Sequence, residues 1–506
     1  MMPGVRSASA DGTRTGETGE QSFPGQTEAT ILGLPPIGPL LAVRKTTKKP
    51  GRKPEQKKKK KKPQKKPEPA AKARPKKVSR KRTPQPPALI KQRLGTCRLC
   101  NADITTTFVD LGMSPLRGTS LTRDDLASME RYYPLHALVC SNCYLVQLKD
   151  VLPPAEMLSE YAGLPAASPR RLQDHRRFSR TIVKRLNLGP DSLAIEIGGH
   201  GNFLPHIKEL DVPVLSIDPH QRSAHQSIDS GIATRVETFT EKLARELAAR
   251  GKLGDVIIGG DVIAQVPDLH DLVAGIARLL KPRGVAILEF PYAERLIVDT
   301  QFDAIHHDQL SYLSLSTLER LVGRHKLKIT EAHELSHDGG SLRVLLSHSS
   351  SARPLNNSVA RILGHERKSG IFDLKTYTSF SQRSQALKRK LLSFLISSRN
   401  SGQTICGCGT PSHANTLFHF CGIGPDFLDF LIDSDPNQHG RFTPGKRIPI
   451  MPPEALRATK PDFVLILPWH LQGELMKELH FIKEWGGKFI VSTPDFLVID
   501  PTTLEA

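Results

Sequence analysis

Residues 193–202 read LAIEIGGHGN, an apolar run that carries Glu196 and ends in a glycine-rich turn. Glycines let the backbone approach a ligand closely, and a helix-like segment over residues 203–210 would begin at this turn. Residues 214–218 form a second apolar run, which ends in Asp218. A carboxylate about 20 residues after such a turn can accept hydrogen bonds from a ribose. This stretch therefore predicts a strand–turn–helix–strand unit that binds a nucleoside.

The alternation continues toward the C-terminus. Residues 255–258 read as a third strand and are followed by Gly259, Gly260 and Asp261. Residues 269–280 read as a helix and residues 285–289 as a fourth strand. Alternating strands and helices favour an α/β fold with a parallel sheet, whose ligand lies at the carboxyl ends of the strands. We expect this domain to span residues 166–345.

A second, smaller domain of the same kind is predicted over residues 346–506. Its first part, residues 354–398, reads as mainly helical. It continues with a short strand over 404–406, a helix over 411–421 and a strand over 430–433 that ends in Asp433, with further strands at 462–467 and 488–491. Together with a preceding module, these two domains account for the length of 506 residues, since about 100–200 residues per domain are usual.

That preceding module, expected over residues 94–165, contains two CxxC pairs. Each pair can form a tight turn that supplies two thiolates, and two such turns complete a tetrahedral zinc site. We therefore predict a closed, structural zinc ion; the alternative is two redox or incidental cysteine pairs. The predicted ligands are Cys97, Cys100, Cys140 and Cys143. The other three cysteines, Cys406, Cys408 and Cys421, are expected to fill a core.

The net charge of +20 lies almost entirely in residues 1–93, which hold 25 Lys/Arg and six Asp/Glu. The rest of the chain holds 46 Lys/Arg and 45 Asp/Glu and is nearly neutral. A uniformly basic DNA-coating protein is therefore excluded. A Lys/Pro-rich segment with so few apolar residues predicts a disordered tail. Its functional interpretations are weak contact with nucleic acid or an acidic surface and a nuclear import signal at residues 75–82. The alternative is a solubilising extension without a partner.

Neither a transmembrane segment nor a secretory signal peptide is evident in the sequence. No stretch of 18 or more apolar residues indicates a transmembrane helix, and the first 20 residues show no apolar core of a signal peptide. A reducing, cytoplasmic location is the expectation, whereas the oligomeric state is not indicated.

Several blocks of the chain, in the same order, resemble one family. The strand ending in Glu-Ile-Gly, the strand ending in Asp and the block LLKPRGVAILEFP resemble class I S-adenosylmethionine-dependent methyltransferases. More specifically, the chain from Cys97 to Phe489 resembles bacterial C-methyltransferases of nucleotide-activated 4-keto-deoxysugars. The blocks that carry this resemblance are CSNCYLVQL, EIG, SIDP, VPDL, QFDAIHHDQLSYLS, HDGGSLRV, CGCGTPSHANTL, DSDPNQHGRFTPGKRIPI and LPWHL.

The resemblance implies a binding site for S-adenosylmethionine. Glu196, Gly198 and Gly201 correspond to the positions around the methionine part of the cofactor, Asp218 to the residue that holds the ribose, and Asp261 to a further cofactor contact. The turn departs from the family pattern. Its glycines are the third, fourth and sixth residues of EIGGHG, where the family has the third, fifth and seventh.

The implied reaction needs a base that removes a carbon-bound proton next to a ketone. The family block Thr-Ile-Tyr-His-Glu-His, whose last histidine acts as that base, reads Ala-Ile-His-His-Asp-Gln at residues 304–309. Gln309 replaces the base, and Gln265 replaces a second family histidine. We therefore expect His306 or His307 to act as the base with Asp308 orienting it, and both glutamines to bind the sugar.

The resemblance also implies contacts with the nucleotide-linked sugar. Ser341 and Arg343 correspond to the family's Gly-Gly-Ser-Leu-Arg block, where they either lie near the substrate or lock a domain interface. In the C-terminal domain, the family residues that surround the nucleotide diphosphate correspond to Gly409, Asn415, Thr416 and Asp433. For Asn415 and Thr416 the alternative is capping of a helix end.

Three functions remain open from the sequence. The first is transfer of a methyl group from S-adenosylmethionine to a carbon of a nucleotide-linked keto-sugar or a related glycan precursor. The second is binding of the sugar nucleotide or the cofactor without methyl transfer, because two histidines are replaced by glutamine. The third is a methyltransferase recruited to nucleic acid by the basic tail.

Overall fold

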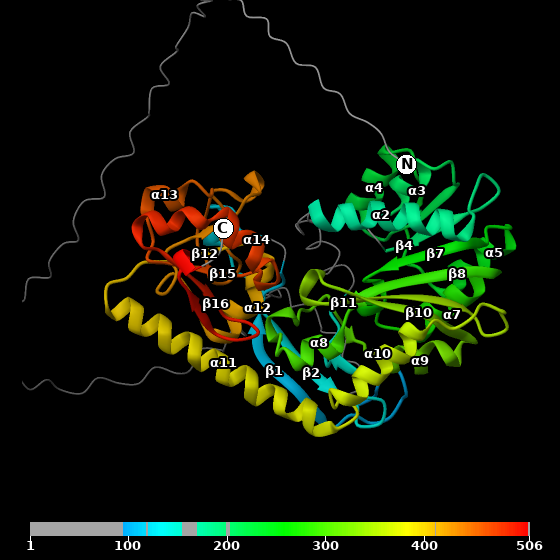
Figure 1. Ribbon diagram of the computed structural model, residues 1–506, viewed down its shortest axis with the longest axis horizontal. Coiled ribbons are helices and arrows are strands. Elements are labelled where there is room, and N and C mark those ends of the chain that lie inside the picture. Colours follow the sequence, from blue (N-terminus) through cyan, green and yellow to red (C-terminus); the bar gives the residue numbers. More distant parts are fainter. Residues whose placement is uncertain (1–94, 118–119, 154–168, 199–202, 410, 504–506) are drawn as a thin grey trace, which may run out of the picture. The chain divides into compact units, whose positions relative to one another are not determined.

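Three β-sheets organise the chain in the computed structural model, which describes residues 95–117, 120–153, 169–198, 203–409 and 411–503. All of these residues belong to one compact unit, residues 81–506 (Figure 1). The basic tail and Gly201 lie outside the described residues. None of the described helices is long and apolar enough to cross a membrane.

The largest sheet has seven strands in the order β10-β11-β8-β7-β4-β5-β6. Five strands, from β8 to β6, run parallel, and β11 is antiparallel to both of its neighbours. The chain order reverses between β4 and β7, so the predicted glycine turn follows the strand at which ligands bind in open α/β sheets. The strands are β4 (Ala194–Ile197), β5 (Val214–Ile217), β6 (Ala233–Arg235), β7 (Gly254–Gly260), β8 (Leu280–Pro291), β10 (Leu327–Leu335) and β11 (Ser341–His348).

Helices cover both faces of this sheet because its strands are apolar on both sides (Figure 1). In β8, Val285 and Ile287 pack toward α2 (Pro169–Leu186) and α3 (Leu204–Lys208). Alternate residues such as Ala286 and Leu288 belong to the cluster on the other face. The helices that contribute to that second cluster are α5 (Glu241–Ala249), α7 (Leu269–Leu279), α9 (Leu315–Arg324) and α10 (Asn357–Lys368).

A four-stranded antiparallel sheet joins the zinc-ligand module to the methyltransferase-like domain. Its order is β1-β2-β3-β9, and β9 (Ser311–Tyr312) comes from far along the chain. Val146 of β3 pairs with Tyr312 of β9, so the module cannot be separated from the larger domain without breaking a sheet. The other strands are β1 (Thr106–Ser114), β2 (Tyr133–Val139) and β3 (Val146–Leu148).

The C-terminal sheet has the order β14-β13-β12-β15-β16-β17 and is parallel except for β17. Helix α12 (Pro411–Cys421) follows β12, as predicted, and the long helix α11 (Leu374–Asn400) packs against β1, where Phe380 stacks on Phe108. All three core cysteines are buried. The strands are β12 (Ile405–Cys408), β13 (Leu431–Ile432), β14 (Ile450–Met451), β15 (Phe463–Ile466), β16 (Lys488–Val491) and β17 (Leu497–Ile499).

The domain boundary expected at residues 345/346 falls within β11, which continues to His348. After that strand, α10 still packs against β10, and its Val359 and Ile362 share the core of the large sheet. Hydrophobic burial therefore keeps the chain with the methyltransferase-like domain until α10 ends at Lys368.

Candidate active site

The cofactor end of the large sheet starts at Gly198, directly after β4. Its φ of +60° is a left-handed conformation, and a Cβ atom there would lie 3.1 Å from a methyl group of Val262. The Gly198 amide donates a 2.9 Å hydrogen bond to the carbonyl of Ile217 on β5. A side chain at this position would thus be strained and crowded, which explains why glycine opens the turn.

Asp218 follows β5 and is buried, at the position expected for a ribose-binding carboxylate. One oxygen, Oδ1, accepts a 2.9 Å hydrogen bond from the backbone amide of His220, and Oδ2 accepts one of 2.5 Å from the Ser223 hydroxyl. Nδ1 of His220 also lies 2.9 Å from Oδ1, so the segment that follows β5 fixes the orientation of this buried carboxylate.

The C-terminal domain repeats this backbone arrangement. Gly409 has a φ of +122° after β12, and its amide donates a 3.0 Å hydrogen bond to the carbonyl of Ile432 on β13. Asp433 follows β13, just as Asp218 follows β5. Its Oδ1 accepts from the amide of Asp435 at 2.9 Å, whereas its buried Oδ2 accepts no hydrogen bond within the described part of the chain. Burial raises the pKa of Asp433.

Glu196 and Asp261 lie at the same edge of the large sheet. Glu196 of β4 is fully buried and accepts a hydrogen bond of 3.3 Å from the amide of Leu204, at the start of α3. Asp261, which follows β7 with a φ of +57°, pairs with Arg171 of α2 at 2.9 Å. The residues expected to contact the cofactor, apart from Gly201, are thus brought together where β4, β5 and β7 end.

The four predicted zinc ligands also converge. All four sulfur atoms lie within 4.8 Å of one another, and two of the pairs, Cys97–Cys143 and Cys100–Cys140, are 3.5 Å apart. Zn–S bonds of about 2.3 Å in a tetrahedron would separate sulfurs by about 3.8 Å. The residue after each pair, Asn101 and Tyr144, has a left-handed φ of 61° and 62°, so the two turns share one backbone shape.

The chemistry of this cluster fits a divalent cation. Hydrogen bonding to the Cys140 and Cys97 thiols, followed by burial, raises the pKa of Cys143. Four thiolates this close together, three of them buried, would repel one another, and a cation in their midst would offset that repulsion. The first turn is also fixed from outside, because the carbonyl of Leu99 accepts from Arg324 at 2.6 Å and lies 2.9 Å from Nε2 of His270.

The loop over residues 304–309 is buried and lies against the zinc-ligand module. Nε2 of His307 is 3.3 Å from the carbonyl of Tyr133, and burial lowers the pKa of His307 to about 4. Asp308 accepts two hydrogen bonds from Arg117, at 2.9 and 2.5 Å. Burial disfavours ionisation of Asp308, but the charges of Arg117 and His306 outweigh it and lower its pKa to about 2.

These contacts define the surroundings of the loop. His307 is bound to a backbone carbonyl of the zinc-ligand module, and Asp308 pairs with Arg117 while the charge of His306 also acts on it. The backbone amide of His306 is 3.1 Å from the Tyr312 hydroxyl oxygen. Gln309 is half-buried just before β9, and Gln265 is half-buried at the end of α6 (Val262–Gln265), which packs against β9.

Asn415 and Thr416 bind backbone groups of other parts of the chain. The Asn415 side-chain amide donates to the carbonyl of Pro115 at 3.0 Å, and the Thr416 hydroxyl donates to that of Ile305 at 2.8 Å. Both residues are buried within α12, so helix capping is not their role. The structure instead uses them to attach α12 to the zinc-ligand module and to the 304–309 loop.

Ser341 and Arg343 lie on β11 inside the large domain. Arg343 is buried and pairs with Glu289 of β8 at 2.8 Å and with Asp174 of α2 at 2.6 Å. Its guanidinium also lies 4.0 Å from the ring centre of Phe178. Arg343 therefore fastens α2 to the sheet within the large domain, whereas the contact expected for it was with the substrate or across a domain interface. Ser341 is buried and pairs with Pro291 of β8.

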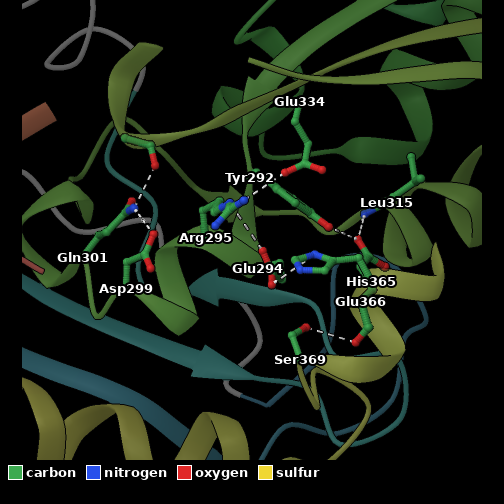
Figure 2. Close-up of polar contacts among 11 residues, drawn as sticks. Tyr292, Glu294, Arg295, Asp299, Gln301, Leu315, Glu334, His365, Glu366 and Ser369 are labelled. Atoms are coloured by element: carbon green, nitrogen blue, oxygen red, sulfur yellow. Dashed lines mark hydrogen bonds and ion pairs between the residues drawn. The ribbon is translucent and has the colours of Figure 1, made fainter. Parts of the chain in front are cut away.

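A buried carboxylate network underlies this region (Figure 2). Glu366 of α10 accepts from the backbone amide of Leu315, at 2.6 Å, and from the Tyr292 hydroxyl, at 3.0 Å. Glu294 lies 3.6 Å from Nδ1 of His365, and burial raises its pKa. A carboxylate at the start of α9 stabilises the positive end of that helix, so this network holds α8 (Ala293–Val298), α9 and α10 together.

Three features together define a class I S-adenosylmethionine-dependent methyltransferase. They are the antiparallel strand β11 in an otherwise mostly parallel sheet, the glycine at position 198 after β4, and Asp218 after β5. Comparison with family models agrees along the chain. A model described as "C-methyltransferase C-terminal domain" matches residues 336–494, one described as "Methyltransferase domain" matches 173–332, and one described as "Putative zinc binding domain" matches 97–158. C-methyltransferase NovU from Streptomyces niveus is 30% identical over 404 residues, which cover 80% of this chain and 96% of that protein. The chain belongs to the C-methyltransferase family.

Comparison with solved structures matched, among others, the PH0226 protein from Pyrococcus horikoshii OT3. It is 15% identical, with 36% of this chain and 92% of that chain covered and a TM-score of 0.29. Magnesium protoporphyrin IX methyltransferase from Synechocystis PCC 6803 is 12% identical, with 38% and 91% covered and a TM-score of 0.28.

Sequence reasoning assigned no role to three residues that shape the site. Arg117 is separated from Asp308 by 191 positions, and nothing local indicates that pairing. Glu289 and His337 lie within the quoted blocks LEFP and HDGG, whose order carried the resemblance. A buried carboxylate at the end of a parallel strand is the signal that could have identified Glu289.

Proposed function

We propose that this protein transfers a methyl group from S-adenosylmethionine to a carbon next to the ketone of a nucleotide-linked deoxysugar. One observation carries the proposal: two places in the chain share the same backbone arrangement, a left-handed glycine after one strand and an aspartate after the neighbouring strand. Gly198 and Asp218 form the first, and Gly409 and Asp433 form the second. A methyl donor and a substrate that each contain a nucleoside would require two such sites.

The first site would bind the donor. Glu196, Gly198 and Gly201 would bind its methionine part and Asp218 its ribose, with Asp261 as a further contact. When bound, S-adenosylmethionine supplies an electrophilic methyl group. The protein's own residues hold it at the carboxyl ends of β4, β5 and β7.

The second site would bind the nucleotide of the substrate. Only glycine fits at position 409, before α12, because φ is +122° and a Cβ atom there would overlap Pro468. Asp433 offers a buried oxygen without a hydrogen-bond partner among the described residues. A sugar hydroxyl of the nucleoside would satisfy it. Gln265 and Gln309, both half-buried, would bind the keto-sugar itself.

Zinc at the four cysteines has a structural role in this proposal. All four ligand positions are taken by thiolates, which leaves no open position for a substrate or a water molecule. Because the thiols must stay reduced, the proposal includes a reducing, cytoplasm-like compartment.

Isothermal calorimetry on the full chain tests the assignment of the two sites. Asp218→Asn should weaken binding of S-adenosylmethionine about 10-fold or more and leave binding of thymidine diphosphate unchanged. Asp433→Asn should weaken binding of thymidine diphosphate and leave binding of S-adenosylmethionine unchanged. Binding of neither ligand by the unaltered protein, or loss of both with either variant, would contradict the two-site proposal.

Binding without methyl transfer is the second candidate function. The low pKa of His307 and the Arg117–Asp308 pair favour it, because neither His307 nor Asp308 is then poised to accept a proton near neutral pH. Binding of both ligands by the unaltered protein, with no methylated product after prolonged incubation, would establish this alternative.

A further inference from the structure

The two CxxC turns of the sulfur cluster have the same backbone shape. In each turn, the residue after the second cysteine has a left-handed φ, and its amide donates a hydrogen bond to the carbonyl of the first cysteine. These bonds join Asn101 to Cys97, at 3.0 Å, and Tyr144 to Cys140, at 2.9 Å. The third residue therefore occupies an equivalent place in the two turns, and its carbonyl takes no part in this bond.

Helix α9 binds that third carbonyl in both turns. Nη1 of Arg324 donates to the carbonyl of Leu99, in the first turn, at 2.6 Å. Nη1 of Arg320 donates to the carbonyl of Asn142, in the second turn, at 3.0 Å. The two arginines are four residues apart, so they are neighbours on one face of α9. Equivalent positions of the two turns thus bind equivalent side chains of a single helix.

The amides that share peptide groups with these two carbonyls bind the sulfur atoms. Hydrogen bonding to the Cys140 thiol raises the pKa of Cys97, and the backbone amide of Cys100 opposes that rise. The thiols of Cys143 and Cys97 lower the pKa of Cys140, and the backbone amide of Cys143 lowers it further. A donor at the carbonyl oxygen polarises a peptide group, so the amide of the same group binds a thiolate more strongly.

The Leu99 carbonyl has a second donor in the large domain. Nε2 of His270, at the start of α7, lies 2.9 Å from it, and Nδ1 of His270 lies 2.8 Å from Nε2 of His325, the residue after α9. Because a carbonyl oxygen only accepts, Nε2 of His270 carries the hydrogen, and in the neutral ring Nδ1 accepts from His325. Helices α7 and α9 pack against each other (Figure 1), so the large domain fixes this turn from two elements.

The charges of α9 complement those of a metal-loaded cluster. Four thiolates and one divalent cation leave two negative charges, and the guanidinium groups of Arg320 and Arg324 supply two positive charges. A third cation, Arg98, lies within the first turn, where its guanidinium donates to the carbonyl of Leu148 at 2.8 Å and also to that of Leu310. The arginines of α9 therefore combine the hydrogen bond and the charge that stabilise thiolates.

We propose that Arg320 and Arg324 hold the two cysteine turns in the geometry that binds the metal ion, and thereby slow its release. They are positioning residues, which act through the peptide groups of the turns and do not contact the metal. The inference rests on the assignment of zinc to the four cysteines and goes beyond the proposed function. It makes metal retention a property of the large domain as well as of the zinc-ligand module.

Transfer of zinc from the full chain to an excess of chelator measures this role. Arg320→Met and Arg324→Met each remove one donor and keep a long side chain, and each should release zinc about 10-fold faster. The double variant should release it faster than either single variant, because each arginine serves a different turn. Arg320→Lys and Arg324→Lys keep the charge and a donor. They should release zinc more slowly than the methionine variants, a difference that packing alone would not produce.

Arg245→Met is the matched control. Arg245 is likewise an exposed helical arginine of the large domain, but it pairs with Glu241 of its own helix, α5, at 2.6 Å. It should release zinc at the unaltered rate. Release by the folded double methionine variant within twofold of the unaltered protein would overturn the proposal. If that variant does not fold, equal rates in the four single variants and the unaltered protein would overturn it. An unaltered protein without zinc would contradict the metal assignment and this inference, whereas the proposed methyl transfer would stand.

Discussion

The indole nitrogen of Trp469 donates a 2.9 Å hydrogen bond to Oδ2 of Asp303, a fully buried carboxyl group. Trp469 belongs to the C-terminal domain, and Asp303 lies in η3 (Phe302–Ala304), directly before the 304–309 loop. Burial raises the pKa of Asp303 to about 7, although the hydrogen bond from Trp469 opposes the shift. This contact between the two domains therefore includes a carboxyl group that titrates near neutral pH.

Asp303 should make the protein less stable as the pH rises. Its folded pKa of about 7 is above the unfolded value of about 3.9, so the folded state binds the extra proton between these two pH values. Stability is lost through that window and the loss is complete above about pH 7. Asp303→Asn keeps an oxygen that accepts from Trp469 but cannot ionise. Compared with the unaltered protein, it should therefore raise the thermal midpoint more at pH 8 than at pH 5. An equal change at both pH values would contradict this account.

The Arg117–Asp308 pair should contribute stability with the opposite pH dependence. The folded pKa of Asp308, about 2, is below the unfolded value of about 3.9, so the contribution is present above about pH 4 and is lost as the pH falls toward 2. Arg117→Met should cost about 2–3 kcal/mol at pH 7, since it leaves a buried charge without its partner. Thermal midpoints at pH 7 and pH 3 measure the difference. Asp308→Asn and the double variant complete the test. If the double variant loses as much stability as the two single variants added together, the two side chains are not coupled.

Metal removal should loosen the contact between the zinc-ligand module and the large domain. We expect one zinc ion per chain by mass spectrometry, and Cys140→Ser should lower both the metal content and the thermal midpoint because the closed ligand set loses a thiolate. Cys406→Ala is the control, since this buried cysteine of β12 lies outside the cluster. A full zinc complement in Cys140→Ser would contradict the assignment of these ligands.

Gly198→Ala should reduce affinity for S-adenosylmethionine and destabilise the fold by about 1–3 kcal/mol, through the left-handed φ and the 3.1 Å approach to Val262. Gly364→Ala, in the interior of α10 with no atom within 4 Å of the added Cβ, should instead stabilise by about 0.5–1 kcal/mol. Calorimetry measures the affinity for S-adenosylmethionine, and thermal denaturation measures the stability of both variants. Unchanged binding in Gly198→Ala would mean that the turn does not contact the cofactor.

Local patterns were sufficient to predict the two nucleotide-type folds. Strands that are apolar and end at glycine or aspartate, as at Gly198, Asp218 and Asp433, identified β4, β5 and β13 within a residue or two. The CxxC spacing likewise identified all four members of the sulfur cluster. In each case the signal lies within a few residues of the element, which is why one sequence suffices.

Partners far apart in the chain could not be predicted. Periodicity shows which face of a helix is buried but not what covers it, so the hydrogen bond from Asn415 to the carbonyl of Pro115, 300 positions away, could not be predicted. Similarly, nothing near Asp308 in the sequence indicates its pairing with Arg117, which comes from another module. Pairings of this kind follow from the tertiary fold alone.

The zinc-ligand module contacts the C-terminal domain as well as the large domain. Leu121 forms a bridge with Phe442, and the Glu130 carboxylate accepts from the amide of Gly445, 315 positions later. During synthesis, the module emerges before these partners are translated. Its four-cysteine cluster needs only residues 97–143, whereas its packing must wait for the chain as far as residue 445. Early capture of a metal ion would therefore preserve the module's local shape until the rest of the protein exists to enclose it.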